Sequence, residues 1–285
     1  MNNQIDFDTV KTIDGVSVQY GKLSDRVYLM KPSGTHAEHD KKIVLNLAKK
    51  EGVSKIFACI PSSWKDSFVH DGFIVEAQIP CFFDNDALLF ASKFLTKERL
   101  ALSDKTKKRI DDVLASAKDK AEAPFVKKKL PEGVELRPLA IDDVGAICKL
   151  YTQVFESYPF PIYQPGYIRR AMNEDVHYFG CFKNNQLIAE SSIEVDRKTS
   201  SAELTDFATH PSARGQALAT HLLAQMEKTL EDLSIKTAFT IARAASYGMN
   251  RTFAGRGYTY CGTLINNTAI SGSIESMNVW YLRKT

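Results

Sequence analysis

Residues 205–223 read TDFATHPSARGQALATHLL, and this stretch decides the fold. A strand is expected to end at Thr209, because His210-Pro211 forces a turn. A long amphipathic helix is expected over 215–233, and its first turn leaves N–H groups unpaired at the positive end of its dipole. Small residues at 213, 215, 217 and 219 let an anion approach the backbone. The stretch predicts a pyrophosphate site, although an ordinary proline-terminated turn stays open.

The spacing of apolar residues after Glu132 alternates between that of strands and that of helices. Elements in this order predict one α/β or α+β domain at 132–285, with a mixed central sheet flanked by helices. Asp142 or Asp143 is expected to cap the first helix of this domain. We expect strands at 134–139, 178–182, 187–195, 202–209, 237–242, 258–266 and 274–282, and further helices at 165–172 and 247–254.

The first part of the chain predicts a smaller α/β domain at 1–115. Its expected strands cover 16–20, 27–30 and 55–60, and its expected helix covers 38–50. A charged, alanine-rich segment follows and can begin as an exposed helix. Residues 116–131 are expected to form a charged linker that is closed by Pro131 and Gly133.

Phe68–Phe73 and Phe253–Tyr258 share an aromatic-xxx-Gly-aromatic pattern. Each follows a strand and a helix in the expected order, and each precedes another strand. Two explanations stay open, an internal duplication that makes the first domain a degenerate half-repeat, or turn chemistry shared by chance. The N-terminal copy has no equivalent of the Arg214 loop, so we do not expect it to bind a second cofactor.

The loop from Arg214 to Ala219 resembles the acetyl-CoA signature of the GNAT superfamily. In that signature an Arg or Gln is followed by two residues, Gly, one residue, and Gly or Ala. Ala217 replaces the first glycine, which is tolerable if that residue is already helical. A second GNAT signature places an Asn and an aromatic residue on a helix that ends in Gly and an aromatic residue. Here Asn250, Phe253 and Gly257-Tyr258 match it.

The resemblance implies an N-acetyltransferase that uses acetyl-CoA as co-substrate and needs no metal. In this family the strand before the loop binds the pantetheine arm through its main chain, and the Asn side chain also contacts the coenzyme. Carried onto this sequence, the expected cofactor-binding residues are Phe207, Ala208, Thr209, Arg214, Gly215, Gln216, Ala217, Leu218, Ala219, Asn250 and Phe253.

Segments from both parts of the chain resemble one GNAT subfamily, the β-lysine N-epsilon-acetyltransferases. Among them are GVSVQYGKLSDRVYLMKP from Gly15 and GTLINNTAISGSIESMNVWY from Gly262. The resemblance implies acetyl transfer to the terminal amine of (3S)-3,6-diaminohexanoate, giving N-epsilon-acetyl-β-lysine, a compatible solute. Two alternatives stay open: a GNAT enzyme for another small amine, polyamine or protein lysine, and a non-catalytic CoA-binding regulatory protein.

Acetyl transfer requires a neutral amine, so a carboxylate base is expected. Glu203 lies on the strand before the loop, where several GNAT enzymes place a base, and Asp206 is the second candidate. A regular strand puts these two residues on opposite faces, so only a bulge brings both toward one cleft. A backbone N–H near Phe207 or Ala208 is expected to bind the developing oxyanion. Many GNAT enzymes have a tyrosine that protonates the leaving thiolate, and Phe253 stands at that position here. No general acid is therefore assigned.

The segment from Glu156 to Tyr163 follows the first helix, and in this fold that region covers the acceptor site. Glu156, Tyr158 and Phe160 are therefore expected to bind substrate, with aromatic rings around its methylene chain. Packing on the core is the alternative. Further candidates are Glu190 as an acid and Arg169, Arg170 and Arg243 as partners of a substrate carboxylate.

The composition is that of a globular protein, and the net charge of +3 argues against a dedicated nucleic-acid binder. The N-terminus MNNQIDFDTV has no signal-peptide pattern, and no apolar run is long enough to span a bilayer. The five cysteines form no CxxC pair, which indicates reduced thiols without a metal, in the cytoplasm. The expected partner is a small diamine or amino acid, and a homodimer stays open.

Overall fold

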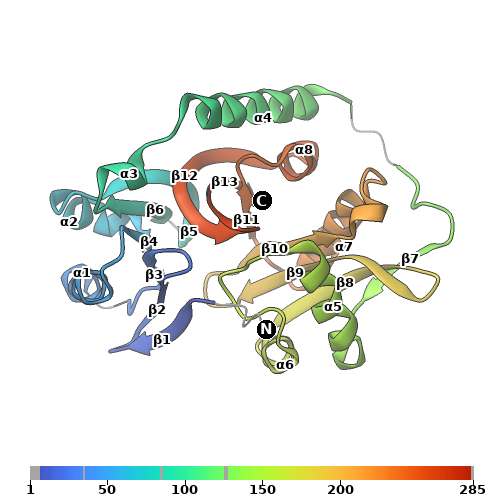
Figure 1. The fold of residues 1–285 in the computed structure, drawn as a ribbon, viewed down its shortest axis with the longest axis horizontal. Coiled ribbons are helices and arrows are strands. Elements are labelled where there is room, and N and C mark those ends of the chain that lie inside the picture. Colours follow the sequence, from blue (N-terminus) through green and yellow to red (C-terminus); the bar gives the residue numbers. More distant parts are fainter. Residues whose placement is uncertain (1–6, 35, 84–85, 125–127, 284–285) are drawn as a thin grey trace.

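The computed structural model describes residues 7–34, 36–83, 86–124 and 128–283. The strands of these residues join one 13-stranded sheet in the order β1-β2-β3-β4-β6-β5-β12-β13-β11-β10-β9-β8-β7. Figure 1 shows the strands of the N-terminal half in blue to cyan beside the C-terminal half in green to red, with α4 passing over both. Within the described ranges, no helix is both long and apolar enough to cross a membrane.

The helices and strands divide between the two halves of the chain. The N-terminal half contains β1 (Thr9–Ile13), β2 (Val16–Gly21), β3 (Arg26–Lys31), α1 (Ala37–Glu51), β4 (Lys55–Pro61), α2 (Lys65–His70), β5 (Ile74–Phe83), β6 (Asp86–Phe94), α3 (Lys97–Leu100) and α4 (Asp104–Glu122). The C-terminal half contains β7 (Val134–Pro138), α5 (Val144–Val154), α6 (Pro165–Asn173), β8 (Val176–Lys183), β9 (Gln186–Asp196), β10 (Ser201–Thr209), α7 (Leu218–Asp232), β11 (Thr237–Arg243), α8 (Tyr247–Ala254), β12 (Thr259–Ile270) and β13 (Ser273–Arg283).

The strands and helices expected from the sequence are present, with ends shifted by a few residues. Asp143, one of the two residues predicted to cap this helix, stands at the N-cap of α5, but its side chain makes no capping hydrogen bond to α5. Its Oδ2 instead accepts the backbone N–H of Ala140 at 2.8 Å, in the turn before the helix. The start of α7 differs from the prediction. Gly215 and Ala217 have φ angles of 82° and 59°, outside the right-handed helical region, so the helix begins only at Leu218.

Each half of the sheet has its own apolar core. On the C-terminal half, α7 buries Leu222, Leu223 and Met226 against β8, β9 and β10. On the N-terminal half, α1 buries Val44 and Leu47 in the same way. A further apolar cluster contains residues of β4, β5, β6, β12 and β13 and so joins the two halves. Burial of this kind stabilises the fold by roughly 25 cal/mol per Å² of apolar surface.

The two halves repeat one arrangement of strands and helices. Within the sheet, β2-β3-β4-β6-β5 in one half corresponds to β9-β10-β11-β13-β12 in the other. In both, the second and third strands of that order are parallel and the remaining neighbours are antiparallel. The halves meet where β5 pairs with β12 at Ala77 and Gly262. Glycine is required there, because a Cβ at 262 would lie 2.1 Å from the carbonyl oxygen of Glu76.

The aromatic-xxx-Gly-aromatic turns are also alike in detail. The N–H of Phe73 donates to Phe68 O, and the N–H of Tyr258 donates to Phe253 O, both at 3.2 Å. The aromatic rings of each pair are T-shaped, with centroids 4.9 and 5.0 Å apart. The glycines before them, Gly72 and Gly257, have φ angles of 82° and 84°. Shared strand order and shared turn geometry together favour duplication over coincidence.

Helix α4 forms the first part of the charged segment and extends through residues 116–122 of the expected linker. One face of α4 is buried, including Ile110, Val113 and Ala117. Arg251 of α8 donates to Ser116 Oγ at 2.7 Å, so α4 is attached to the C-terminal half. Residues 125–127 lie outside the described residues. The division into 1–115, 116–131 and 132–285 stays a proposal.

Candidate active site

The strand before the predicted anion loop contains a β-bulge. β10 pairs with β9 up to Thr205 and again from Ala208, and the register shifts between these two points. Asp206 lies in the bulge with a φ angle of 57°. As a result, Glu203 and Asp206 line the same cavity instead of opposite faces of the sheet. The bulge that brings Glu203 and Asp206 toward one cavity is therefore present.

β10 and β11 are parallel and separate after three residue pairs. The last pair is Glu203 with Phe239, whereas β10 continues to Thr209 and β11 to Arg243. On this side, the backbone of β10 beyond Glu203 has no pairing with β11. An extended ligand can form main-chain hydrogen bonds with such a strand edge.

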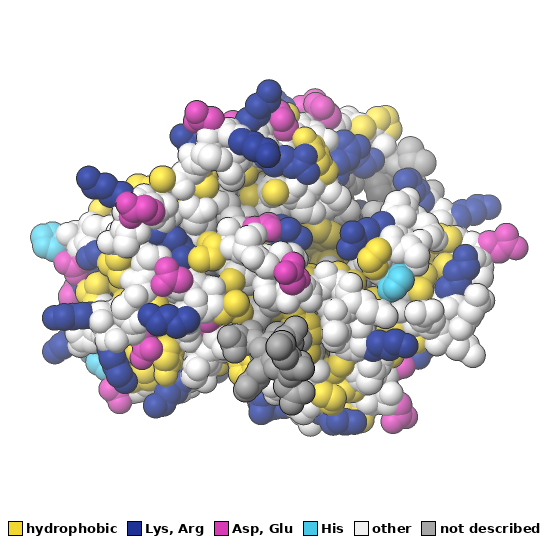
Figure 2. Space-filling model, in the orientation of Figure 1, with side chains coloured by type: hydrophobic (Ala, Val, Ile, Leu, Met, Phe, Trp, Pro, Cys, Tyr) yellow, Lys and Arg dark blue, Asp and Glu magenta, His cyan; other side chains and the backbone are white. Residues whose placement is uncertain are grey.

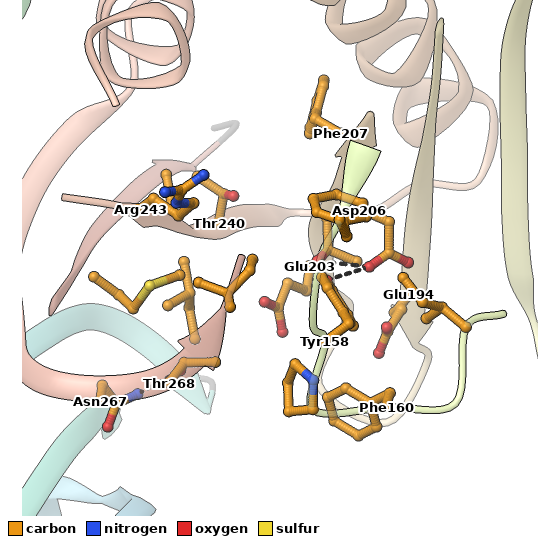
Figure 3. A pocket seen from close by; sticks show the side chains of 18 of the residues that line it. Tyr158, Phe160, Glu194, Glu203, Asp206, Phe207, Thr240, Arg243, Asn267 and Thr268 are labelled. Atoms are coloured by element: carbon orange, nitrogen blue, oxygen red, sulfur yellow. Dashed lines mark hydrogen bonds between the residues drawn. The ribbon is translucent and has the colours of Figure 1, made fainter. Parts of the chain in front are cut away.

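Three carboxyl groups line the cavity beside the bulge, Glu194 from β9 and Glu203 and Asp206 from β10 (Figure 3). Glu194 and Glu203 are directly opposite each other in the β9–β10 register. Asp206 is held in place, because Tyr158 Oη donates to its Oδ1 at 2.5 Å and Ser192 Oγ donates to its Oδ2 at 2.7 Å. Among the described residues, none donates a hydrogen bond to Glu203, so its carboxylate can receive a proton from a ligand.

Burial raises the pKa values of these three carboxyl groups, and repulsion adds to this effect at Glu194 and Glu203. The pKa of Glu203 lies well above its usual value, because burial disfavours the charged form and Glu194 and Asp206 repel it. Burial and then the charge of Asp206 raise the pKa of Glu194 to about 7. Glu194 is the most exposed of the three, so water screens part of this effect. Carboxyl groups with raised pKa values are stronger bases than ordinary carboxylates and are suited to accept a proton from a bound amine.

The cavity around these groups has a volume of about 170 Å³, and both halves of the chain line it. Tyr158, Phe160 and Tyr167 contribute aromatic rings from the C-terminal half, and Tyr28 and Phe57 contribute rings from β3 and β4. Glu203 lies between the two sides in Figure 3. Acidic groups beside aromatic rings are suited to a cation with an aliphatic chain.

A larger cleft of about 770 Å³ lies between the start of α7 and α8. Figure 2 shows this face hollowed below α4, with Lys and Arg side chains near the hollow. The basic residues that line the cleft are Lys120, Lys128, Arg214, Arg243, Arg251 and Arg256. The cleft and the smaller cavity share four lining residues, Phe155, Phe207, Arg243 and Met249. The two spaces are therefore neighbours, and a ligand in the cleft lies next to the cavity that contains Glu203.

The loop before α7 has the backbone conformation of an anion site. Gly215 and Ala217 both have positive φ angles, and no acidic residue occupies the first turn of α7. Successive turns of this kind direct N–H groups toward one point, at the positive end of the helix dipole. An alanine in place of the first signature glycine was expected to be tolerable if residue 217 were already helical. Ala217 instead has a left-handed backbone conformation, so this expectation is wrong. Its Cβ costs roughly 1–2 kcal/mol in this conformation.

Comparisons with known proteins agree with this geometry. The model of the Acetyltransferase (GNAT) family matches residues 145–258. A beta-lysine N(6)-acetyltransferase from Methanococcus maripaludis is 37% identical over 264 residues, which cover 93% of this chain and 94% of the relative. The chain belongs to the GNAT acetyltransferase family. It is an acetyl-CoA-dependent N-acetyltransferase.

Two further similarities cover parts of this acetyltransferase. A beta-lysine N(6)-acetyltransferase from Methanosarcina mazei is 37% identical over 186 residues, 65% of this chain and 67% of the relative. The solved ribosomal-protein-S18-alanine N-acetyltransferase from Escherichia coli is 17% identical, with a TM-score of 0.46. That alignment covers 53% of this chain and 93% of the solved one.

Acetyl-CoA fits the residues that this acetyltransferase presents. Of the expected cofactor-binding residues, those that line the cleft are Phe207, Thr209, Arg214, Gly215, Ala217, Leu218 and Ala219. The unpaired edge of β10 suits an extended pantetheine arm, and the α7 amides with nearby basic side chains suit a diphosphate. Gln216 and Ala208 do not line the cleft with their side chains, and Phe253 lines the smaller cavity instead.

The structure does not place Asn250 of this acetyltransferase at the cofactor cleft. Its Oδ1 accepts hydrogen bonds from Asn278 and Trp280, both at 2.8 Å. Its Nδ2 donates to Arg243 O at 3.0 Å and to Ser246 O at 2.7 Å. These bonds use both amide hydrogens and both acceptor sites, so the wholly buried side chain fixes α8 to β11 and β13.

Several expected substrate contacts also lie outside the acceptor cavity. Glu156 is exposed and lies against Gly272 in the β12–β13 turn, whereas Tyr158 and Phe160 do line the cavity. Glu190 is wholly buried and does not line the cavity. The remaining three candidates are Arg169 and Arg170, which are exposed on α6, and Arg243, which lines the cavity but is ion-paired with Glu275.

Sequence patterns missed two charged residues of the acceptor cavity, Glu194 and Arg26. Glu190 and Glu194 are four residues apart on β9, so strand alternation places both side chains on the same face of the sheet. This alternation was the one signal in the sequence that could have identified Glu194. Its position opposite Glu203 depends on the strand register, which the sequence does not show. Arg26 comes from the other half of the chain, and no local pattern distinguishes it from a surface arginine.

Proposed function

We propose that this acetyltransferase transfers the acetyl group of acetyl-CoA to the terminal amine of β-lysine, giving N-epsilon-acetyl-β-lysine. The observation that carries this proposal is the group of three carboxyls, Glu194, Glu203 and Asp206, in the acceptor cavity next to the cofactor cleft, with which the cavity shares Phe207 and Arg243. The two relatives named beta-lysine N(6)-acetyltransferase support the same substrate.

The acidic group suits a substrate that carries positive charge. β-Lysine has two ammonium groups and one carboxylate at neutral pH, so its net charge is positive. Attraction to Glu194 and Glu203 offsets part of the cost of removing an ammonium group from water. The rings of Tyr158 and Phe160 then contact the methylene chain.

Glu203 is the proposed base. A lysine-like amine has a pKa of ~10.4, so only about one molecule in two thousand is neutral at pH 7. Acetyl-CoA supplies the activated acetyl group as a thioester. Glu203 lies at the last β10–β11 pair, next to the strand edge proposed for the pantetheine arm, and it accepts the amine proton directly or through a water. Asp206 orients the site, because it already accepts hydrogen bonds from Tyr158 and Ser192.

The charge of the product fits the proposed role as a compatible solute. Acetylation removes the charge of one ammonium group, and the remaining ammonium and carboxylate cancel. The product is therefore a neutral zwitterion that can accumulate without adding net charge to the cell.

A continuous assay of CoA thiol release tests the proposal. We expect kcat/KM for β-lysine to exceed that for α-lysine by about ten-fold or more, since moving one ammonium group changes a buried polar contact. Spermidine and a lysine-containing peptide serve as competitors, because they represent the polyamine and protein-lysine alternatives. Equal kcat/KM values for lysine and β-lysine would contradict the proposal. Acetyl-CoA binding without turnover of any amine would instead favour a CoA-binding regulatory protein.

A further inference from the structure

Arg26 brings a positive charge from the N-terminal half into the acceptor cavity. It is the first residue of β3, its side chain is 3% exposed, and it lines the same cavity as Glu203. Two of the oxygens that Arg26 binds belong to Asn267 and Thr268. Figure 3 shows these two residues across the cavity from Glu194, with Glu203 between them. The cavity therefore has an acidic side and a basic side.

The protein uses only part of the hydrogen-bonding capacity of Arg26. Its Nη1 donates to Asn267 O at 2.7 Å and to Thr268 Oγ1 at 3.0 Å, and its Nη2 donates to Gln19 Oε1 at 3.1 Å. Its Nε is buried and has no partner. A guanidinium has five N–H donors, so the Nε–H and one Nη2–H remain for a ligand.

The charge of Arg26 also lacks a direct counterion. Within the ranges that the structure describes, no carboxylate lies within 4.0 Å of its guanidinium. Burial lowers the pKa of Arg26 to about 10, so the side chain is still charged at neutral pH. The rings of Tyr28 and Phe57 lie 5.0 and 5.5 Å from its Cζ and help to fix its position. The buried carboxylate of Asp8 acts on this charge only from beyond ion-pair distance. A buried charge without a paired anion is costly to the fold, so an anionic group of a ligand would stabilise it there.

We infer that Arg26 binds the carboxylate of the acceptor substrate and that the enzyme therefore selects amino acids over polyamines. This inference rests on the proposed function and adds the residue that recognises the substrate class. Arginine pairs with carboxylates through two parallel N–H donors, which gives direction as well as affinity. The bound carboxylate holds the neighbouring 3-amino group near Arg26, and the distal amine extends to Glu203. The N-terminal half thus determines which amine reacts.

Removal of the carboxylate from the substrate tests the inference in the wild-type enzyme. The probe is 1,4-diaminopentane, which is β-lysine without its carboxylate. We expect its kcat/KM to be about 30-fold to 1,000-fold lower than that of β-lysine, because it leaves a buried charge unpaired. Equal values for the two amines would overturn the inference whatever any variant does.

The variant Arg26→Gln should lose this preference. We expect its ratio of kcat/KM values for β-lysine and 1,4-diaminopentane to fall to within about ten-fold of one, and Arg26→Lys to restore part of it. The KM for acetyl-CoA should not change, since Arg26 does not line the cofactor cleft. Arg170→Gln is the matched control, because this exposed arginine of α6 lies outside the cavity and should keep the wild-type ratio.

The outcomes separate the inference from the proposed function. If the enzyme acetylates β-lysine and Arg26→Gln keeps the full ratio, the inference fails and the proposed function stands. If β-lysine is not a substrate but α-lysine is, the test uses the ratio of kcat/KM values for α-lysine and 1,5-diaminopentane instead. Loss of that ratio in Arg26→Gln would support carboxylate recognition although the proposed substrate is wrong.

Discussion

The two halves of this acetyltransferase contain the same strand–helix unit, yet the starts of their helices differ. In the N-terminal half, residues 32–36 lead from β3 to α1, and α1 carries Glu38 and Asp40 in its first turn. Asp40 is wholly buried and accepts hydrogen bonds from the backbone N–H and the hydroxyl of Ser33, both at 2.6 Å. In the C-terminal half, residues 210–217 precede α7, whose first turn carries no acid.

This difference explains how one unit can serve two purposes. At the start of α1, two acids in the first turn repel an anion, and Asp40 is already bonded to Ser33, so this helix start is closed to an anionic ligand. At the start of α7, no acid competes for the amides, which suits the diphosphate proposed to bind there. The strands differ too. By their first parallel pairs, Arg26–Lys55 and Ser201–Thr237, Tyr28 in β3 corresponds to Glu203 in β10. One strand supplies the proposed base and the other an aromatic wall.

The largest effect is expected when the two corresponding strand residues are changed. Glu203→Gln should lower kcat/KM for the acceptor amine by about 10²–10⁴, the usual contribution of a general base, without changing the affinity for acetyl-CoA. Tyr28→Phe should lower it by less than about ten-fold, because only the weak contact to Cys59 Sγ is lost. Steady-state kinetics and acetyl-CoA titration check both. Equal losses would mean that Glu203 has no special role.

The pH profile sharpens this prediction. Since the pKa values of Glu194 and Glu203 are raised, both carboxyls bind protons at pH values where an ordinary glutamate is ionised. In the wild type, kcat/KM should therefore rise with pH through about 7 and level off once the cluster has lost its protons. In Glu203→Gln the position of this break should move. An unchanged profile would remove Glu203 from the role of base.

The second prediction copies the closed helix start of α1 into α7. Ala219→Glu places an acid at the second residue of α7, where α1 has Glu38. We expect the KM for acetyl-CoA to rise by about ten-fold to 100-fold, because the carboxylate repels the diphosphate. The melting temperature should stay the same or increase, since an acid in the first turn stabilises a helix. Glu38→Gln is the control and should leave this KM unchanged.

The third prediction tests whether the aromatic-xxx-Gly-aromatic turns are equivalent. Gly72→Ala and Gly257→Ala should each destabilise the protein by roughly 1–2 kcal/mol, since both glycines have positive φ angles. A Cβ at either position meets no atom within 4 Å, so the cost is that of the backbone alone. Thermal unfolding should show similar shifts, about 2–4 °C per kcal/mol. Clearly unequal shifts would argue that the turns differ.

The smallest effect is expected at Ala217. Ala217→Gly removes a Cβ from a residue with a φ angle of 59°, so we expect a gain of about 1 kcal/mol or less in stability. The affinity for acetyl-CoA should change little, because the loop already has the required conformation. Differential scanning fluorimetry and acetyl-CoA titration measure the two quantities. A loss of stability would show that the left-handed conformation of Ala217 costs the protein nothing.

Local sequence patterns predicted much of this protein. The 3.6-residue spacing placed α7 and α8, and His210-Pro211 placed the turn between β10 and α7, because these features depend on neighbours in the chain. The anion site in that turn stays a prediction. The turn after Phe68 and the turn after Phe253 were likewise visible as a repeated pattern. From the sequence, a bulge in β10 was only a requirement for Glu203 and Asp206 to face one cavity. The pairing of β10 with β9 shows that this bulge exists.

The sequence by itself determined the GNAT unit, and it predicted a cofactor loop and Glu203 as the base. Tertiary structure alone decided what surrounds the acceptor amine. Strand register set Glu194 opposite Glu203, and the β5–β12 junction brought Arg26 to Asn267, 241 positions later in the chain. It also bonded Asn250 to Trp280, outside the residues that line the proposed cofactor cleft. The physical reason is that a helix or a loop forms from adjacent residues, whereas a cavity forms from strands whose contacts depend on the packing of the whole sheet.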